Sequence, residues 1–232
     1  MPKYRIKFAR LREARFVAHL DIARAFERAV RRTGEPMVFT KGFNPHPKIS
    51  FAFPAQVGIT AQEEFVDIEL SKSVVPEEFA SKLNDVLPKG ITVIKVRPVC
   101  GKAPSLMSLL KSATYRVSAG LLNPIQEHRL MKDVESFLGF TEINVDRVRK
   151  GKKSIINIRE GILKLTGRID KNKGMVFEMH LQAGSTGNIR PEEVLNSFLK
   201  KYNYRVDTDT IEITRTGLYS RTGNEYISLW KC

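Results

Sequence analysis

"AHLDIARAFERAVRRTGEP", residues Ala18 to Pro36, has the spacing of an amphipathic helix that ends abruptly. Apolar side chains between Ile22 and Val30 recur on one side, and charged side chains fall on the other. Gly34 and Pro36 end the pattern, because glycine suits the residue after a helix and proline cannot continue one. The stretch predicts a helix over about residues 18–33 with one face against a core.

Strand patterns lie on both sides of this helix. Tyr4, Ile6 and Phe8 alternate with Arg5 and Lys7, which is the period of a strand with one face in water. The other elements predicted in the first hundred residues are strands at 37–39, 49–53, 66–70 and 91–96 and a helix that begins near Pro76.

The second half of the sequence repeats this order of elements without repeating the residues. The order is strand, helix, two or three strands, helix, strand, and two βαβ-like units of this kind with an antiparallel sheet are typical of ferredoxin-like folds. A stretch rich in proline and glycine separates the halves and reads as a linker. We therefore predict an α+β protein of two ferredoxin-like (βαβ-type) α/β sandwich domains in tandem, over residues 1–99 and 113–232, joined by a linker at 100–112.

The charge is strongly positive and unevenly distributed. The 232 residues include 39 Lys and Arg against 25 Asp and Glu, for a net charge of +14. Residues 1–60 alone hold 12 Lys and Arg against 4 Asp and Glu. Such an excess concentrates polyanions at the surface, so RNA or DNA is the favoured partner, and RNA is the one that we expect. An anionic membrane surface is the second reading, and an inert basic surface is the third.

Several classes of protein are disfavoured by what the sequence lacks. Cys100 and Cys232 are the only cysteines, too few for a zinc site or an iron–sulfur cluster. No apolar run approaches the ~20 residues that span a bilayer. The start of the chain reads as a strand rather than a signal peptide. No glycine-rich nucleotide motif or nucleophile motif occurs. We expect a cytoplasmic protein with no cofactor, no metal and no membrane.

A stiff loop precedes the strand pattern at 49–53. Gly42 permits unusual backbone angles, while Pro45 and Pro47 fix their own φ and push Asn44 and His46 towards extended conformations. Polar groups held on such a loop lose little conformational entropy on binding. Asn44 and His46 are therefore candidate ligand contacts.

The same loop carries charge and an aromatic ring. Lys41 and Lys48 flank it as candidate anion contacts, and Phe43 is placed either to stack on a base or to plug the core. The structural alternative is a rigid turn in which the side chains of Asn44 and His46 bond to nearby backbone.

His19 stands at the start of the predicted helix and leans towards its apolar side. A histidine in such a position is more often a core residue than a ligand contact. A ferredoxin-like order nevertheless brings a helix start near the end of a neighbouring strand. His19 and His46 are then candidates to share acid–base work or a substrate phosphate.

Basic residues form two candidate phosphate contacts. The first is the polar side of the predicted helix with the neighbouring strand, although part of the helix stripe is neutralised by Glu27. The second is a basic run that reads as a hairpin tip or a loop. Their members are Arg5, Lys7, Arg24, Arg28 and Arg31 in the first set and Arg149, Lys150, Lys152 and Lys153 in the second.

Four strings of residues carry a resemblance to a known family. They are Phe16–Asp21, Phe26–Ala29, Gly42–Phe51 and Lys102–Leu106. Together they resemble the radical-SAM-linked family of uncharacterised bacterial proteins, domain of unknown function 2344. The match covers the first half of the chain most strongly. Because the activity of the family is not established, the resemblance assigns no catalytic residue.

What the resemblance implies is association with a cobalamin-binding radical SAM protein. The chain itself lacks the Cys-x3-Cys-x2-Cys pattern of such an enzyme. We therefore expect an accessory protein, without activity of its own, that binds RNA or presents a substrate during RNA or ribosome modification. The alternatives are a metal-independent endoribonuclease that uses His19 and His46 as acid and base, and a scaffold for an acidic protein partner.

Overall fold

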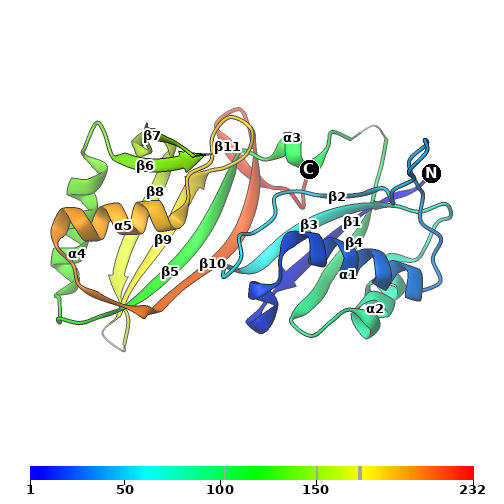
Figure 1. The fold of residues 1–232 in the computed structure, drawn as a ribbon, viewed down its shortest axis with the longest axis horizontal. Helices are drawn as coiled ribbons and strands as arrows, with labels where there is room; N and C mark the ends of the chain where they lie inside the picture. Colours follow the sequence, from blue (N-terminus) through cyan, green and yellow to red (C-terminus); the bar gives the residue numbers. More distant parts are fainter. Residues whose placement is uncertain (102, 150, 172–173) are drawn as a thin grey trace. The chain divides into compact units, whose positions relative to one another are not determined.

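The computed structural model describes residues 1–101, 103–149, 151–171 and 174–232, and it has an α+β architecture. The chain divides into two compact units. Unit 1 consists of Met1–Lys111 together with Arg215–Cys232, and unit 2 is Ser112–Thr214. Each unit combines helices with β-strands (Figure 1).

Unit 1 is built on a sheet in which β1 is paired on both sides. The strand order is β4–β1–β3, and both β2 and the last part of β10 also pair with β3. The β1–β3, β1–β4 and β2–β3 pairs are antiparallel. Its elements are β1 (Lys3–Arg10), the 3-10 turn η1 (Arg12–Phe16), α1 (His19–Arg32), β2 (Ile49–Phe51), β3 (Thr60–Glu69), α2 (Pro76–Val86), β4 (Ile91–Val99), α3 (Leu106–Leu109), the end of β10 (Val206–Thr222) and β11 (Glu225–Ser228).

The helix predicted over residues 18–33 is confirmed as α1. Its apolar side packs with α2 on one face of the sheet in a single core (Figure 1). Aromatic rings make up much of this core, since the ring centroids of Phe8 and Phe26 are 4.8 Å apart and those of Phe26 and Phe51 are 5.7 Å apart. Phe51 therefore connects β2 to the helix that carries His19.

The strand predicted at 37–39 is reduced to two isolated bridges. Met37 pairs with Leu70, and Phe39 pairs with Pro47. Pro36 and Pro47 have no N–H group, so a continuous ladder cannot form across them. The segment instead closes the base of the loop that follows it.

Residues 100–111 of the predicted linker belong to unit 1. Leu106 and Leu110 are fully buried, and Ser105 Oγ accepts the Ser108 N–H at 3.2 Å to cap α3. The residues from Arg215 to Cys232 also pack in unit 1, whereas the sequence placed them in a second domain of 113–232. Unit 2 begins at Ser112, which is the last residue of the predicted linker.

Unit 2 has the strand order β10–β5–β9–β8. The β5–β9 and β8–β9 pairs are antiparallel, and β6 and β7 form a separate antiparallel hairpin, which was one of the two readings of the basic run. Phe198 of the last helix packs on both Phe137 and Phe177, with ring centroids 5.4 and 5.0 Å away. Its elements are β5 (Ser112–Leu121), α4 (Glu127–Leu138), β6 (Asn144–Arg149), β7 (Lys152–Asn157), η2 (Arg159–Gly161), β8 (Ile162–Ile169), β9 (Gly174–Gln182), α5 (Pro191–Tyr202) and the first part of β10.

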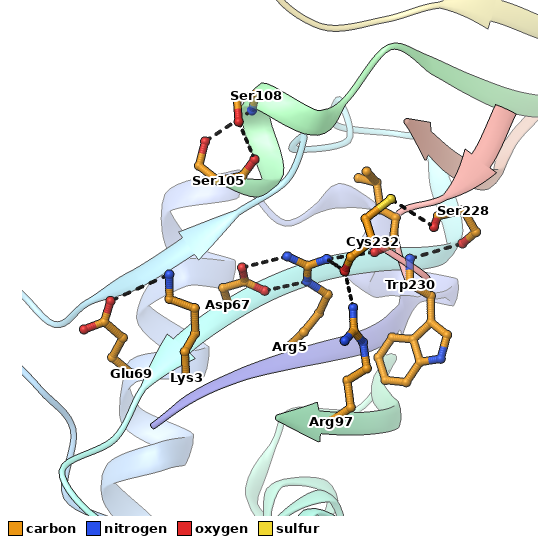
Figure 2. A network of polar contacts seen from close by, with 11 residues as sticks. Lys3, Arg5, Asp67, Glu69, Arg97, Ser105, Ser108, Ser228, Trp230 and Cys232 are labelled. Atoms are coloured by element: carbon orange, nitrogen blue, oxygen red, sulfur yellow. Dashed lines mark hydrogen bonds and ion pairs between the residues drawn. The ribbon is translucent and has the colours of Figure 1, made fainter. Parts of the chain in front are cut away.

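A buried arginine joins β1 and β3 to the end of unit 1 (Figure 2). Arg5 is fully buried, and its Nε and Nη2 donate to the two carboxylate oxygens of Asp67 at 2.9 and 3.1 Å. Its Nη1 donates to the carbonyl oxygens of Leu229 and Cys232 at 2.9 and 2.8 Å. Arg97 also donates to the Cys232 oxygen.

A second buried arginine fixes β10 against β3. Arg215 Nε donates to Glu64 Oε1 at 2.9 Å, and its Nη2 donates to the carbonyl oxygen of Phe53 at 2.5 Å. Both partners are almost fully removed from water, with side-chain exposures of 1% for Arg215 and 7% for Glu64. The two buried ion pairs therefore attach the last segment of the chain to unit 1.

The Arg5–Asp67 pair predicts a large effect on stability. Asp67→Asn keeps the shape of the side chain but leaves a buried guanidinium without its counter-charge, which costs about 3–5 kcal/mol of unfolding free energy. Urea unfolding followed by circular dichroism measures this loss. Glu178→Gln, beside the exposed Arg116, is the matched control and should change stability by less than about 1 kcal/mol. Equal effects of the two variants contradict a structural role for Arg5.

Candidate functional site

The loop that precedes β2 is closed at its base by backbone hydrogen bonds. Thr40 N–H donates to the His46 oxygen at 2.8 Å, and His46 N–H donates to Thr40 Oγ1 at 3.0 Å. One pair further on, Lys48 N–H donates to the Val38 oxygen at 2.8 Å. The tip at 41–45 is therefore held on a fixed stem, as the prolines predicted.

Phe43 lies at this tip with its ring fully exposed to water. The preceding Gly42 has φ of +133°, which side-chain-bearing residues rarely adopt. Asn44 and His46 are also exposed, and in the described part of the chain their side chains make no hydrogen bond. Of the two roles considered for Phe43, the plug in the core is excluded, because the ring projects away from the protein.

The lysines that flank the loop differ in their surroundings. Lys48 Nζ lies 2.9 Å from Glu69 Oε2, and Lys3 Nζ lies 3.9 Å from the other oxygen of the same carboxylate. Lys41 is exposed and has no ion pair among the described residues. The uncompensated positive charge of the loop is therefore on Lys41, next to the exposed ring.

The outer side of α1 presents the three arginines that the sequence selected. Arg24 Nη1 lies 3.4 Å from Asp21 Oδ1, and Arg31 Nη2 lies 2.9 Å from Glu27 Oε1. Arg28 Nε donates to the Arg24 carbonyl oxygen at 3.3 Å, leaving its other guanidinium nitrogens exposed. Exposed pairs of this kind contribute about 0–1 kcal/mol, so phosphate groups can replace the carboxylates at small cost.

Two basic residues predicted to contact nucleic acid do not lie on this surface. Arg5 is completely buried in its pair with Asp67, and Lys7 is partly buried in a pair with Glu63. The physical reason is the central place of β1, which is paired on both edges and carries the end of the chain over the Arg5 side. Neither residue is retained in the candidate interface.

The basic hairpin of unit 2 is only partly available for contact. Lys152 and Lys153 are exposed on β7. Arg147 on β6 instead forms two bonds to Glu193, at 2.7 and 2.6 Å. Of the predicted contacts, Lys150 and the side chain of Arg149 lie outside the described residues.

A pocket of about 420 Å³ lies in unit 1 between α1, β2 and α3. Its polar lining comes from His19, Arg24, Glu27 and Ser50. The His19 ring meets Phe51 edge-on, with centroids 5.0 Å apart. His46 is not part of this lining, so the pocket does not bring the two predicted imidazoles together.

The surroundings of His19 favour its neutral form. Partial burial lowers the pKa of the imidazole, and the positive charge of Arg10 lowers it further. Arg10 is itself buried, and its Nη2 donates to the carbonyl oxygens of Gln56 and Ile59 at 2.7 and 2.8 Å. One guanidinium thus both organises the turn after β2 and discourages protonation of His19.

Sequence reasoning missed several parts of this pocket. Ser50 and Met107 line it, and Arg10 sets the charge near it, yet of these only Ser50 lies in one of the motif strings, and none was selected as a site residue. Met107 comes from the segment read as a linker. The alternation of the strand pattern at 49–53 placed Ser50 on the face opposite Phe51, so it gave no sign that both residues line one pocket.

Features that would suggest other classes of site are few in the described residues. There, no three side chains of His, Cys, Asp or Glu gather as a metal site would require. Within the same residues, none of the helices is long and apolar enough to cross a bilayer. Cys100 is exposed and Cys232 is half-buried, and neither is in a disulfide.

The lowered pKa of His19 predicts a measurable pH dependence. In an NMR titration its ring should titrate below the ordinary value of 6.5. Because the unfolded chain then binds more protons than the folded chain, the wild type should lose stability relative to His19→Gln as the pH falls below 6.5. Urea unfolding from pH 7.5 to 5 measures this difference, and a titration midpoint above 6.5 contradicts the described environment.

Comparison with known proteins identifies the family of the chain. No relative was found among curated proteins. A family model described as "Uncharacterized protein conserved in bacteria (DUF2344)" matches residues 3–191, which include α1, the stiff loop and the pocket. This agrees with the resemblance carried by the motif strings of the first half. The chain belongs to the DUF2344 family of proteins conserved in bacteria.

Proposed function

We propose that this protein binds RNA and presents it, in the cytoplasm, to a radical SAM enzyme that modifies RNA or a ribosomal component. The observation that carries the proposal is Phe43, an exposed ring on a closed loop beside Lys41, whose charge has no ion pair among the described residues. Aromatic rings next to cations are the usual contacts of single-stranded nucleic acids, because bases stack on the ring and phosphates meet the charge.

The charge of the protein supports the same proposal. The net charge is +14, and the exposed arginines of α1 lie in the same unit as the loop. The base of the loop is fixed by hydrogen bonds, so ordering it on RNA requires little entropy. The exposed lysines of the β6–β7 hairpin supply further contacts that do not depend on sequence.

The proposed partner is a cobalamin-binding radical SAM protein. Its support is the resemblance of the motif strings to the radical-SAM-linked family. The strand order is β4–β1–β3–β2 in unit 1 and β10–β5–β9–β8 in unit 2, so in each unit the last of the four strands lies beside the first, followed by the third and the second. This shared order further supports a ferredoxin-like fold for both units. Sheets of this kind commonly serve as platforms for RNA.

The proposal predicts that Phe43→Ala weakens binding without changing its salt dependence. Loss of one stacked base costs about 1–3 kcal/mol, which is roughly a 5- to 150-fold loss of affinity. Fluorescence anisotropy with a labelled single-stranded RNA, measured from 50 to 300 mM KCl, tests this. Met131→Ala, which truncates an exposed apolar side chain of α4, is the control and should leave the affinity unchanged.

Lys41→Ala should change the salt dependence of RNA binding. Removing one phosphate contact is expected to lower the slope of log K against log salt by about 0.7 for a single strand. Lys89→Ala, at an exposed lysine before β4, is the control for the loss of charge. An absence of RNA binding at low salt, or binding that does not respond to salt, overturns the proposal. Cleavage of the RNA that is lost in His19→Ala would identify an endoribonuclease instead.

A further inference from the structure

We propose that the pocket along α1 holds one unstacked RNA base and that Glu27 accepts a hydrogen bond from the exocyclic amino group of that base. This inference rests on the proposed function, because it assigns a place to one nucleotide of the bound RNA. It goes further in naming the bases that are preferred, those with an exocyclic amino group over uracil.

The dimensions of the pocket fit a single nucleotide. Its lining along α1 runs from His19 to Glu27, and eight residues of helix rise about 12 Å. The volume of about 420 Å³ lies in the ordinary range for small-molecule sites. A nucleoside monophosphate laid along the helix therefore reaches from one end of the pocket to the other.

The walls of the pocket are mainly apolar. Leu20 and Ala23 line it from α1, and Ile49 and Phe51 line it from β2. Met107 adds a flexible, exposed thioether from α3. Such side chains shelter the faces of a base, while a methionine adapts to bases of different size.

The charge along the pocket is complementary to that of a nucleotide. α1 begins at His19 without a side-chain cap, and the N–H groups of His19 and Leu20 have no hydrogen bond within the described residues. The Arg24 guanidinium reaches back towards this end, where Asp21 is its only carboxylate partner in the described chain. Glu27 lies at the other end. A phosphate is favoured near His19 and a hydrogen-bond donor is favoured near Glu27.

Glu27 has an acceptor to spare. Its Oε1 accepts from Arg31 at 2.9 Å, and no bond to Oε2 is found within the described residues. A carboxylate accepts from the amino group of cytosine or adenine. Uracil presents a carbonyl oxygen at the position of the cytosine amino group, and two acceptors repel each other. The preference for cytosine over uracil should therefore depend on whether the base carries an amino group or a carbonyl oxygen at this position.

The sharpest test compares cytidine 5′-monophosphate with uridine 5′-monophosphate, which differ at this group. Titration of the full chain, followed by NMR of the Met107 methyl and the His19 ring, should give at least fivefold tighter binding of the cytidine nucleotide. Glu27→Gln should bring the two affinities within a factor of two. The ratio is the readout, because removing a negative charge strengthens binding of both anions alike. Glu77→Gln, at an exposed glutamate of α2, should keep the wild-type ratio.

Ala23→Leu provides a second, independent variant. A leucine is compatible with the helix and fills the pocket, so it should abolish the shifts of Met107 while leaving the salt slope for long RNA intact. Thermal unfolding of this variant establishes that it is folded. Equal affinity for both nucleotides, or shifts confined to the loop at 41–45, overturns the inference.

The remaining outcomes separate this inference from the proposed function. Selective binding of the cytidine nucleotide in the pocket, without binding of long RNA, keeps the pocket and overturns the RNA-binding function. Binding of long RNA without nucleotide shifts at His19 and Met107 keeps the RNA-binding function and overturns the base site in the pocket. Displacement of the cytidine nucleotide from the pocket by polyglutamate at low salt identifies a docking groove for an acidic protein and overturns the base site.

Discussion

The buried ion pair between Arg5 and Asp67 is the constraint on which unit 1 depends. A guanidinium without contact to water is tolerated only when its charge is balanced and its N–H groups have acceptors. Asp67 balances the charge, and the carbonyl oxygens of Leu229 and Cys232 accept the remaining bonds. The pair therefore specifies which segment covers this side of the sheet, a choice that apolar packing alone would leave less defined.

Buried and exposed arginines have different roles in unit 1. Arg10 is buried and donates to the main-chain oxygens of Gln56 and Ile59, in the turn that follows Pro54, a residue that lines the pocket. Arg24 and Arg28 are exposed on α1 with weak partners, so they are available to an anion. A buried arginine thus organises the turn beside the pocket, and exposed arginines supply positive charge on α1. The degree of burial determines which role an arginine has.

The elements with strong periodicity were predictable from sequence, and the long-range partners were not. The spacing in α1 and the prolines of the loop gave the helix and the stiff stem, because both effects act within a few residues. Arg5 was misplaced because its alternation with Ile6 is the same whether water or a distant segment covers that side. The segment that covers it follows more than 200 residues later, and no local pattern announces that contact. Likewise, Met107 lines the pocket although it lies in a stretch whose composition indicated a linker.

Because unit 1 is discontinuous, its completion is tied to the order of synthesis. Met1–Lys111 leaves the ribosome first, but Arg215, Leu229 and Cys232 follow only after the whole of unit 2. Until then Arg5 lacks its bonds to Leu229 and Cys232, and Glu64 lacks its ion pair with Arg215. The edge of β3 that pairs with β10 is also exposed. Unit 2 is thus able to complete its fold before unit 1, which reverses the usual order of domain folding along a nascent chain.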